Sequence, residues 1–166
     1  LDHLIEKNKK PRLYYYSNGS IISYKGQSIT DKWKHFDRVT YRVSLDVSGS
    51  AANYWRSGSD WETIVNNIRT VKANTNNVDI IYVITLAWPT LFRLGDLLNE
   101  LEKIDIGPFV IAFNPMWEPK FAIQHLPLNI KQKAKEYLKT IPYFERNKQE
   151  RGNLDSLLSY LDSDGD

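Results

Sequence analysis

The chain has 166 residues, of which 42% are hydrophobic and 25% are charged, a composition typical of a globular domain and not of a disordered segment. Its net charge of +2 is too small to indicate nucleic-acid binding, and no stretch approaches the roughly 20 apolar residues that span a bilayer. Cysteine is absent, which excludes disulfides, thiolate nucleophiles and cysteine-bound metals within this chain. We therefore expect a cytoplasmic protein.

Strands and helices are predicted to alternate along the first two thirds of the chain. The predicted elements, in order, are a helix over 1–10, a strand over 12–17, a helix over 28–36, a strand over 38–46, a helix over 59–71, a strand over 78–86, a helix over 89–101, a strand over 109–113, and two helices over 129–141 and 154–161.

Several of these boundaries rest on recognisable local signals. Asn18-Gly19 is a turn signal after the first strand, and it also suits a hairpin into residues 21–24. The segment Ser59-Asp60-Trp61-Glu62 reads as a capping box with Ser59 as the N-cap, and Asn129 is the expected cap of a later helix. The strand over 78–86 is almost continuously apolar, which predicts burial on both faces.

The alternation predicts an α/β fold in which a parallel sheet is joined by right-handed crossovers. We expect this unit to span residues 1–128 and to contain four βα units, followed by carboxy-terminal helices over 129–166. Ligands of such sheets bind beyond the carboxyl ends of the strands. The polar residues predicted at those ends are Ser17-Asn18-Gly19, Ser44-Leu45-Asp46, Thr85 and Asn114.

The strand that ends at Asp46 alternates apolar and polar residues, so Ser44 and Asp46 share one face. A carboxylate with a serine two residues earlier suits a hydroxyl-rich ligand such as a ribose. A strand with one face in solvent explains the same alternation. Arg56, in the following loop, can clamp a ligand carboxylate or pair with an exposed acid.

The order of these segments resembles that of radical S-adenosylmethionine (SAM) proteins of the twitch-domain type. The resemblance covers nearly the whole chain. It includes a strand ending in Ser17-Asn18-Gly19, the Ser44-Leu45-Asp46 strand, Arg56 before a capped helix, Thr85, a leucine-rich helix, Asn114, and Leu126-Pro127 followed by Lys131 or Lys133.

The resemblance implies a partial TIM-like (β/α) barrel, which an amino-terminal portion would complete. In the family, that portion holds a 4Fe–4S cluster that cleaves SAM to a 5′-deoxyadenosyl radical. It further implies that Ser44 and Asp46 approach the SAM ribose, that Arg56 approaches its carboxylate, and that Asn18, Thr85 and Asn114 line the same cavity. No catalytic residue is indicated in this chain.

Two features depart from the family pattern. The cluster-binding cysteines are absent, so the cluster ligands would lie outside this chain, which alone would be inactive. Val47 stands where a glycine commonly follows the Ser-x-Asp pattern. The missing portion would be an amino-terminal half lost by truncation or a separate complementary chain, unless the protein is a degenerate relic. A cluster-free α/β binding or interaction module is the alternative function. The substrate is not indicated.

Overall fold

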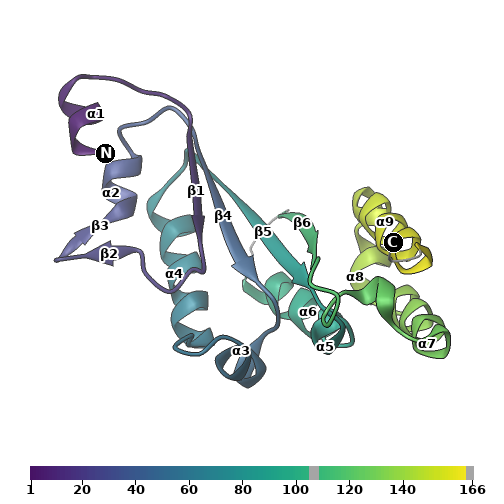
Figure 1. The fold of residues 1–166 in the computed structure, drawn as a ribbon. Helices are drawn as coiled ribbons and strands as arrows, with labels where there is room; N and C mark the ends of the chain where they lie inside the picture. Colours follow the sequence, from purple (N-terminus) through teal and green to yellow (C-terminus); the bar gives the residue numbers. More distant parts are fainter. Residues whose placement is uncertain (105–108, 164–166) are drawn as a thin grey trace.

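Four strands form one parallel sheet that organises the structure, a computed structural model that describes residues 1–104 and 109–163. The strands are β1 (Leu13–Ser17), β4 (Val39–Leu45), β5 (Val78–Leu86) and β6 (Val110–Pro115), and they pair in the order β1-β4-β5-β6. All three pairings are parallel, so the four carboxyl ends lie at the same edge of the sheet (Figure 1). The predicted α/β fold with a parallel sheet is therefore confirmed.

Helices connect the strands and continue beyond the sheet (Figure 1). Their bounds are α1 (Asp2–Glu6), α2 (Ile29–Trp33), α3 (Gly49–Trp55), α4 (Trp61–Asn74), α5 (Trp88–Leu91), α6 (Leu94–Ile104), α7 (Leu128–Lys139), α8 (Pro142–Arg146) and α9 (Arg151–Asp162), with 3-10 turns η1 (Ile123–His125) and η2 (Lys148–Glu150). A small antiparallel hairpin, β2 (Ser23–Tyr24) and β3 (Gln27–Ser28), precedes α2. Among the described residues, no helix is long and apolar enough to cross a membrane.

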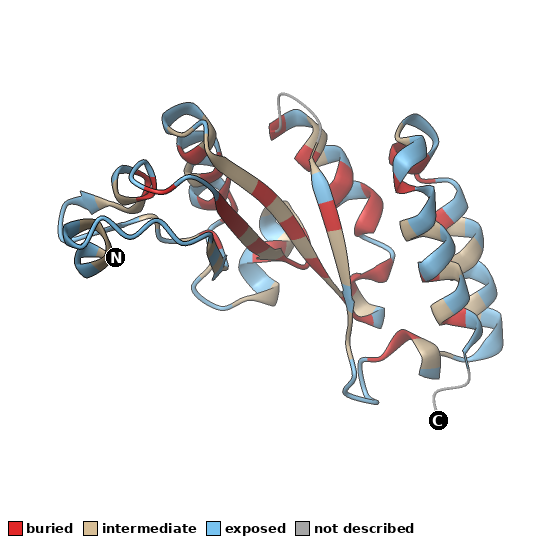
Figure 2. Cartoon of the chain, turned by 90° about the horizontal axis from the view of Figure 1, so that it is seen from above, coloured by how far each residue is buried: buried red, intermediate tan, exposed pale blue. Residues whose placement is uncertain are grey.

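The two faces of the sheet have different environments. The helix-covered face carries Tyr41 and Val43 of β4 and Tyr82 and Ile84 of β5, all at most 2% exposed. The apolar stripes of α4 and α6 pack on this face, and both helices lie on the same side of the sheet (Figure 2). The opposite face, which we call the open face, has no helix over it in the described part of the chain (Figure 2).

The expectation that the 78–86 strand is buried on both faces is wrong. In β5, Ile80, Tyr82 and Ile84 are buried, whereas Ile81 and Val83 between them are only half-buried. The apolar run therefore has one face that is buried under the helices and one apolar face that is only partly covered.

The carboxy-terminal helices cover the outer edge of β6. Tyr143 of α8 stacks on Phe109, with ring centroids 5.4 Å apart. The side-chain amide of Asn153 in α9 donates to the main-chain oxygen of Ile111, at 3.4 Å. These helices thus limit further pairing at that edge, whereas β1 forms the opposite edge. The division at residue 128 stays a prediction, and residues 164–166 of its second part lie outside the described residues.

Three predictions of local structure are wrong. The N-cap of α4 is Asp60, whose carboxylate accepts from the Thr63 amide at 2.9 Å, and not Ser59. The helix expected to be capped by Asn129 begins at Leu128 after Pro127, without a side-chain cap. Asn18-Gly19 does not turn into a hairpin with β1, because β2 pairs with β3 and β1 pairs with β4.

Candidate functional site

The register of the strands brings the predicted site residues to one edge of the sheet. Thr85 of β5 is the direct neighbour of Asn114 in β6. Leu45 of β4 is the direct neighbour of Ile84 in β5. Ser44 therefore lies one residue before that position, and Asp46 lies one residue after it, at the carboxyl end of the strand. Since side chains alternate, Ser44, Thr85 and Asn114 share the open face. We call this set of strand ends, with Asn18 and Asp46, the carboxyl rim.

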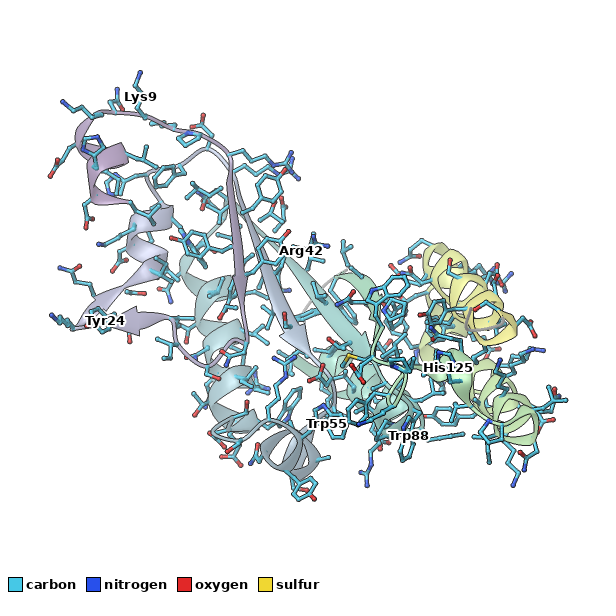
Figure 3. All side chains as sticks on the ribbon, viewed as in Figure 1. Lys9, Tyr24, Arg42, Trp55, Trp88 and His125 are labelled. Carbon is cyan, nitrogen blue, oxygen red and sulfur yellow. The ribbon has the colours of Figure 1, made fainter. Side chains whose placement is uncertain are left out.

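A narrow crevice beside β4 gathers four of the six predicted residues. Asn18, Ser44, Asp46 and Arg56 line it, and its other walls come from β4, α3 and α4. Trp55, at the end of α3, is one of these wall residues and lies near the carboxyl end of β4 (Figure 3). Thr85 and Asn114 do not line the crevice; they lie further along the same edge.

Asp46 and Arg56 form a two-pronged ion pair in the crevice. Nε of Arg56 lies 2.5 Å from Oδ2 of Asp46, and its second terminal nitrogen, Nη2, lies 3.1 Å from Oδ1. The Asp46 side chain is 7% exposed and that of Arg56 is 34% exposed, so the carboxylate depends on this arginine for compensation of its burial. Of the two sequence-based alternatives for Arg56, the structure shows pairing with an acid of this chain, although that acid is buried.

The position of Arg56 follows from α3, a short helix that the sequence analysis missed. The Arg56 amide donates to the Ala52 oxygen at 3.0 Å and so ends α3. Asn53 of α3 accepts from the Trp61 amide through its side-chain oxygen at 2.8 Å, which joins α3 to the start of α4. The seven residues of α3 begin with Gly-Ser-Ala-Ala and lack a long apolar stripe, so their periodicity carries little signal.

Asn18 is held at the rim by the turn that follows β1. Its side-chain oxygen accepts from the main-chain N–H of Ser20 at 3.0 Å. The side-chain amide of Asn67, in α4, donates to the main-chain oxygens of Gly19 and Ser20. Gly19 has a φ of +78°, and a Cβ at this position would lie 3.0 Å from Ile64. The turn signal therefore marks a close contact between the chain after β1 and α4.

Three rim residues retain unused hydrogen-bonding capacity. The side chains of Ser44, Thr85 and Asn114 make no hydrogen bond with another described residue. Two hydroxyls and an amide therefore lie free along three neighbouring strands, beside a carboxylate that is already paired. Such a row can donate to and accept from a ligand with several hydroxyl groups.

The resemblance implies two cofactors, SAM and a 4Fe–4S cluster, and the polar groups of the rim fit only SAM. Hydroxyls, an amide and a carboxylate match the hydroxyl groups of a ribose in chemistry, although a ligand carboxylate could engage Arg56 fully only if the Asp46 pair opened. An iron–sulfur cluster does not fit, because the chain contains no cysteine. Within the described residues, no group of three or more His, Asp or Glu side chains could hold a metal ion.

Val47, the second departure from the family pattern, is 4% exposed and belongs to the hydrophobic core. Its side chain also lines the crevice. The valine therefore narrows the space that a glycine would leave open.

Sequence reasoning did not single out Arg42, which lies on the open face two residues before Ser44. Its importance depends on which carboxylates are already paired, and this is visible only in the structure.

Comparison of the chain with protein-family models, with curated proteins and with solved structures found no significant match.

Proposed function

We propose that this chain is a portion of a radical SAM enzyme and that its carboxyl rim binds SAM. The observation that carries the proposal is the register of the parallel strands, which brings Ser44, Thr85 and Asn114 to one edge on one face. In this proposal the four strands are part of a (β/α)-barrel wall, with the open face turned toward the barrel interior. Strands that pair in sequential order with helices on one side support such a wall.

Each rim residue would then have a binding or positioning role. Ser44 and Asp46 would hold the SAM ribose, and Thr85 and Asn114 would contact the same molecule from the next two strands. Asn18 would offer its side-chain N–H groups, since its oxygen is already used within its own turn. Arg56 would orient Asp46 and would reach the SAM carboxylate when the ion pair rearranges.

The cluster that cleaves SAM in the family would be supplied by an amino-terminal half or by a complementary chain. This chain's own residues would bind SAM and exclude water at the rim. The partner would cover the open face, whose half-buried apolar side chains Ile81 and Val83 leave a parallel sheet without its second layer.

Anaerobic reconstitution of the full-length protein with iron and sulfide tests this function. We expect an iron–sulfur absorbance and reductive cleavage of SAM to 5′-deoxyadenosine. A Ser44→Ala variant should load iron normally but bind SAM several-fold more weakly. A reconstituted protein that neither takes up iron nor binds SAM would refute the assignment.

One observation favours a second candidate, a cluster-free α/β module that binds a small nucleotide or a partner. The Asp46–Arg56 pair satisfies its own charges, as expected for an ion pair that fixes α3 against β4 and takes no part in ligand binding. The two candidates differ in the effect of Asp46→Asn. The radical SAM proposal predicts weaker SAM binding, and the module predicts only lower stability.

A further inference from the structure

Three arginines lie on or beside the polar row of β4, and two of them pair with a carboxylate. Arg38 pairs with Asp79 at 2.5 Å, and Arg56 pairs with Asp46 at 2.5 Å. Arg42, between them on the central strand β4, forms no ion pair with any described residue. Of these three arginines, Arg42 is therefore the one without a carboxylate partner.

The immediate neighbours of Arg42 hold its side chain without neutralising it. Nη1 of Arg42 donates to the Tyr16 hydroxyl at 3.1 Å, and its guanidinium carbon lies 5.3 Å from the centre of the Tyr16 ring. Nε is enclosed and has no hydrogen-bond partner. The guanidinium is thus positioned by an aromatic ring and keeps most of its five N–H donors unused.

Partial burial of Arg42 favours an anion beside its guanidinium. Arg42 is half-buried, and a charged group removed from water needs a counter-ion or acceptors to compensate for lost hydration. The hydroxyl of Thr40, two residues earlier in the same row, is also enclosed and without a partner, in a side chain only 3% exposed. Two unsatisfied donors therefore lie next to each other on one face of β4.

An apolar surface continues from Arg42 across the sheet. The strand register places Tyr16, Arg42, Ile81 and Val110 side by side, one residue from each strand. Tyr16 is 65% exposed and Val110 is 54% exposed. Because neighbouring strands are about 5 Å apart, the apolar part of this row begins within the length of one aromatic ring from Arg42.

We propose that this row is a binding site for an oxyanion, a carboxylate or a phosphate, attached to an apolar body. The terminal nitrogens of Arg42 bind the oxyanion, Tyr16 positions the guanidinium, and Ile81 and Val110 contact the apolar body. The inference goes beyond the proposed function and does not depend on it, because it uses none of the six residues to which that function assigns a role.

Nuclear magnetic resonance of the arginine guanidinium groups tests the site directly in the full chain. Benzoate and phenyl phosphate serve as probes of the two oxyanion types, and acetate and inorganic phosphate are the same anions without an apolar body. We expect saturable shifts of the Arg42 signals, with at least tenfold tighter binding of the aromatic member of one pair. That pair identifies the preferred oxyanion.

Arg38→Gln, directly before β4, and Arg42→Gln, within it, form a matched pair of variants. Arg38 already has its carboxylate, so its loss should leave probe binding unchanged, whereas loss of Arg42 should abolish it. Equal, non-saturating shifts of Arg38 and Arg42 in the wild type would overturn the proposal, and this result does not depend on the folding of either variant. Saturable binding that persists in Arg42→Gln would overturn it as well.

Discussion

The two faces of the sheet are built from alternate residues of the same strands, yet they serve different purposes. On the helix-covered face, Tyr82 and Ile84 have 0% exposure and belong to the core. On the open face, Ile81 and Val83 remain half-buried beside Arg42 and Ser44. The comparison shows that a shift of one residue along a strand separates side chains that stabilise the fold from those available to a ligand.

Core truncation should give the largest difference between the faces. Ile84→Ala removes a side chain with 0% exposure under the helices, and we expect the free energy of unfolding to fall by about 2–5 kcal/mol. Ile81→Ala on the open face should cost about 1 kcal/mol or less, because water already reaches its side chain. Urea denaturation of both variants measures this. Equal losses would show that another part of the protein covers the open face in solution.

The two ion pairs provide a smaller but sharper contrast. Arg56→Ala leaves the Asp46 carboxylate buried without its partner, and we expect a loss of about 1–3 kcal/mol in stability. Arg38→Ala breaks a pair whose side chains are 59% and 45% exposed, and should change stability by less than about 0.5 kcal/mol. Thermal and urea unfolding of the two variants test the contrast. A negligible effect of Arg56→Ala would mean that Asp46 is solvated.

Alkaline pH should lower the free energy of unfolding through a tyrosine on the helix-covered face. Burial raises the pKa of Tyr82 above its ordinary value, because the ionised phenol would be desolvated. Its contribution to stability is fully present below the unfolded-state pKa of about 10 and is lost as the pH rises through the folded-state value. We expect a loss of about 1 kcal/mol near pH 11, since one pH unit above the unfolded-state pKa corresponds to about 1.4 kcal/mol per group.

Urea titrations between pH 8 and pH 11.5 measure this dependence. Tyr82→Phe should make the curve less steep without flattening it, because burial also raises the pKa of Tyr41 and Tyr143. Tyr54→Phe, at a position that is 89% exposed, should leave the curve unchanged. An identical slope in Tyr82→Phe and the wild type would assign the alkaline loss to other groups.

Much of the fold could be predicted because the relevant signals are local. The alternation in Val39–Leu45 and the apolar stripe of Trp61–Asn74 each specify an element and its buried side. The sequence does not decide the N-cap of α4, because Ser59 and Asp60 can both accept a backbone N–H, and the bond from the Thr63 amide to Asp60 is visible only in the structure. Helix α3 was missed because seven residues carry too little periodicity.

The candidate site could be predicted only in part, because only some of its features depend on local sequence signals. Strand ends follow from the order of elements, so Thr85 and Asn114 were expected at one edge, and the register supports this. Ion-pair partners depend on loops and registers in three dimensions. The sequence therefore left the role of Arg56 open, and it gave no sign that Arg42 has no carboxylate partner among the described residues, unlike Arg38 and Arg56.

Titration of this chain with SAM, followed residue by residue by amide nuclear magnetic resonance, tests the central claim most directly. The account predicts shifts concentrated at Ser44, Asp46, Thr85 and Asn114, with little change at the far ends of the strands. Binding elsewhere, or no binding in this chain and in the completed protein, would contradict it.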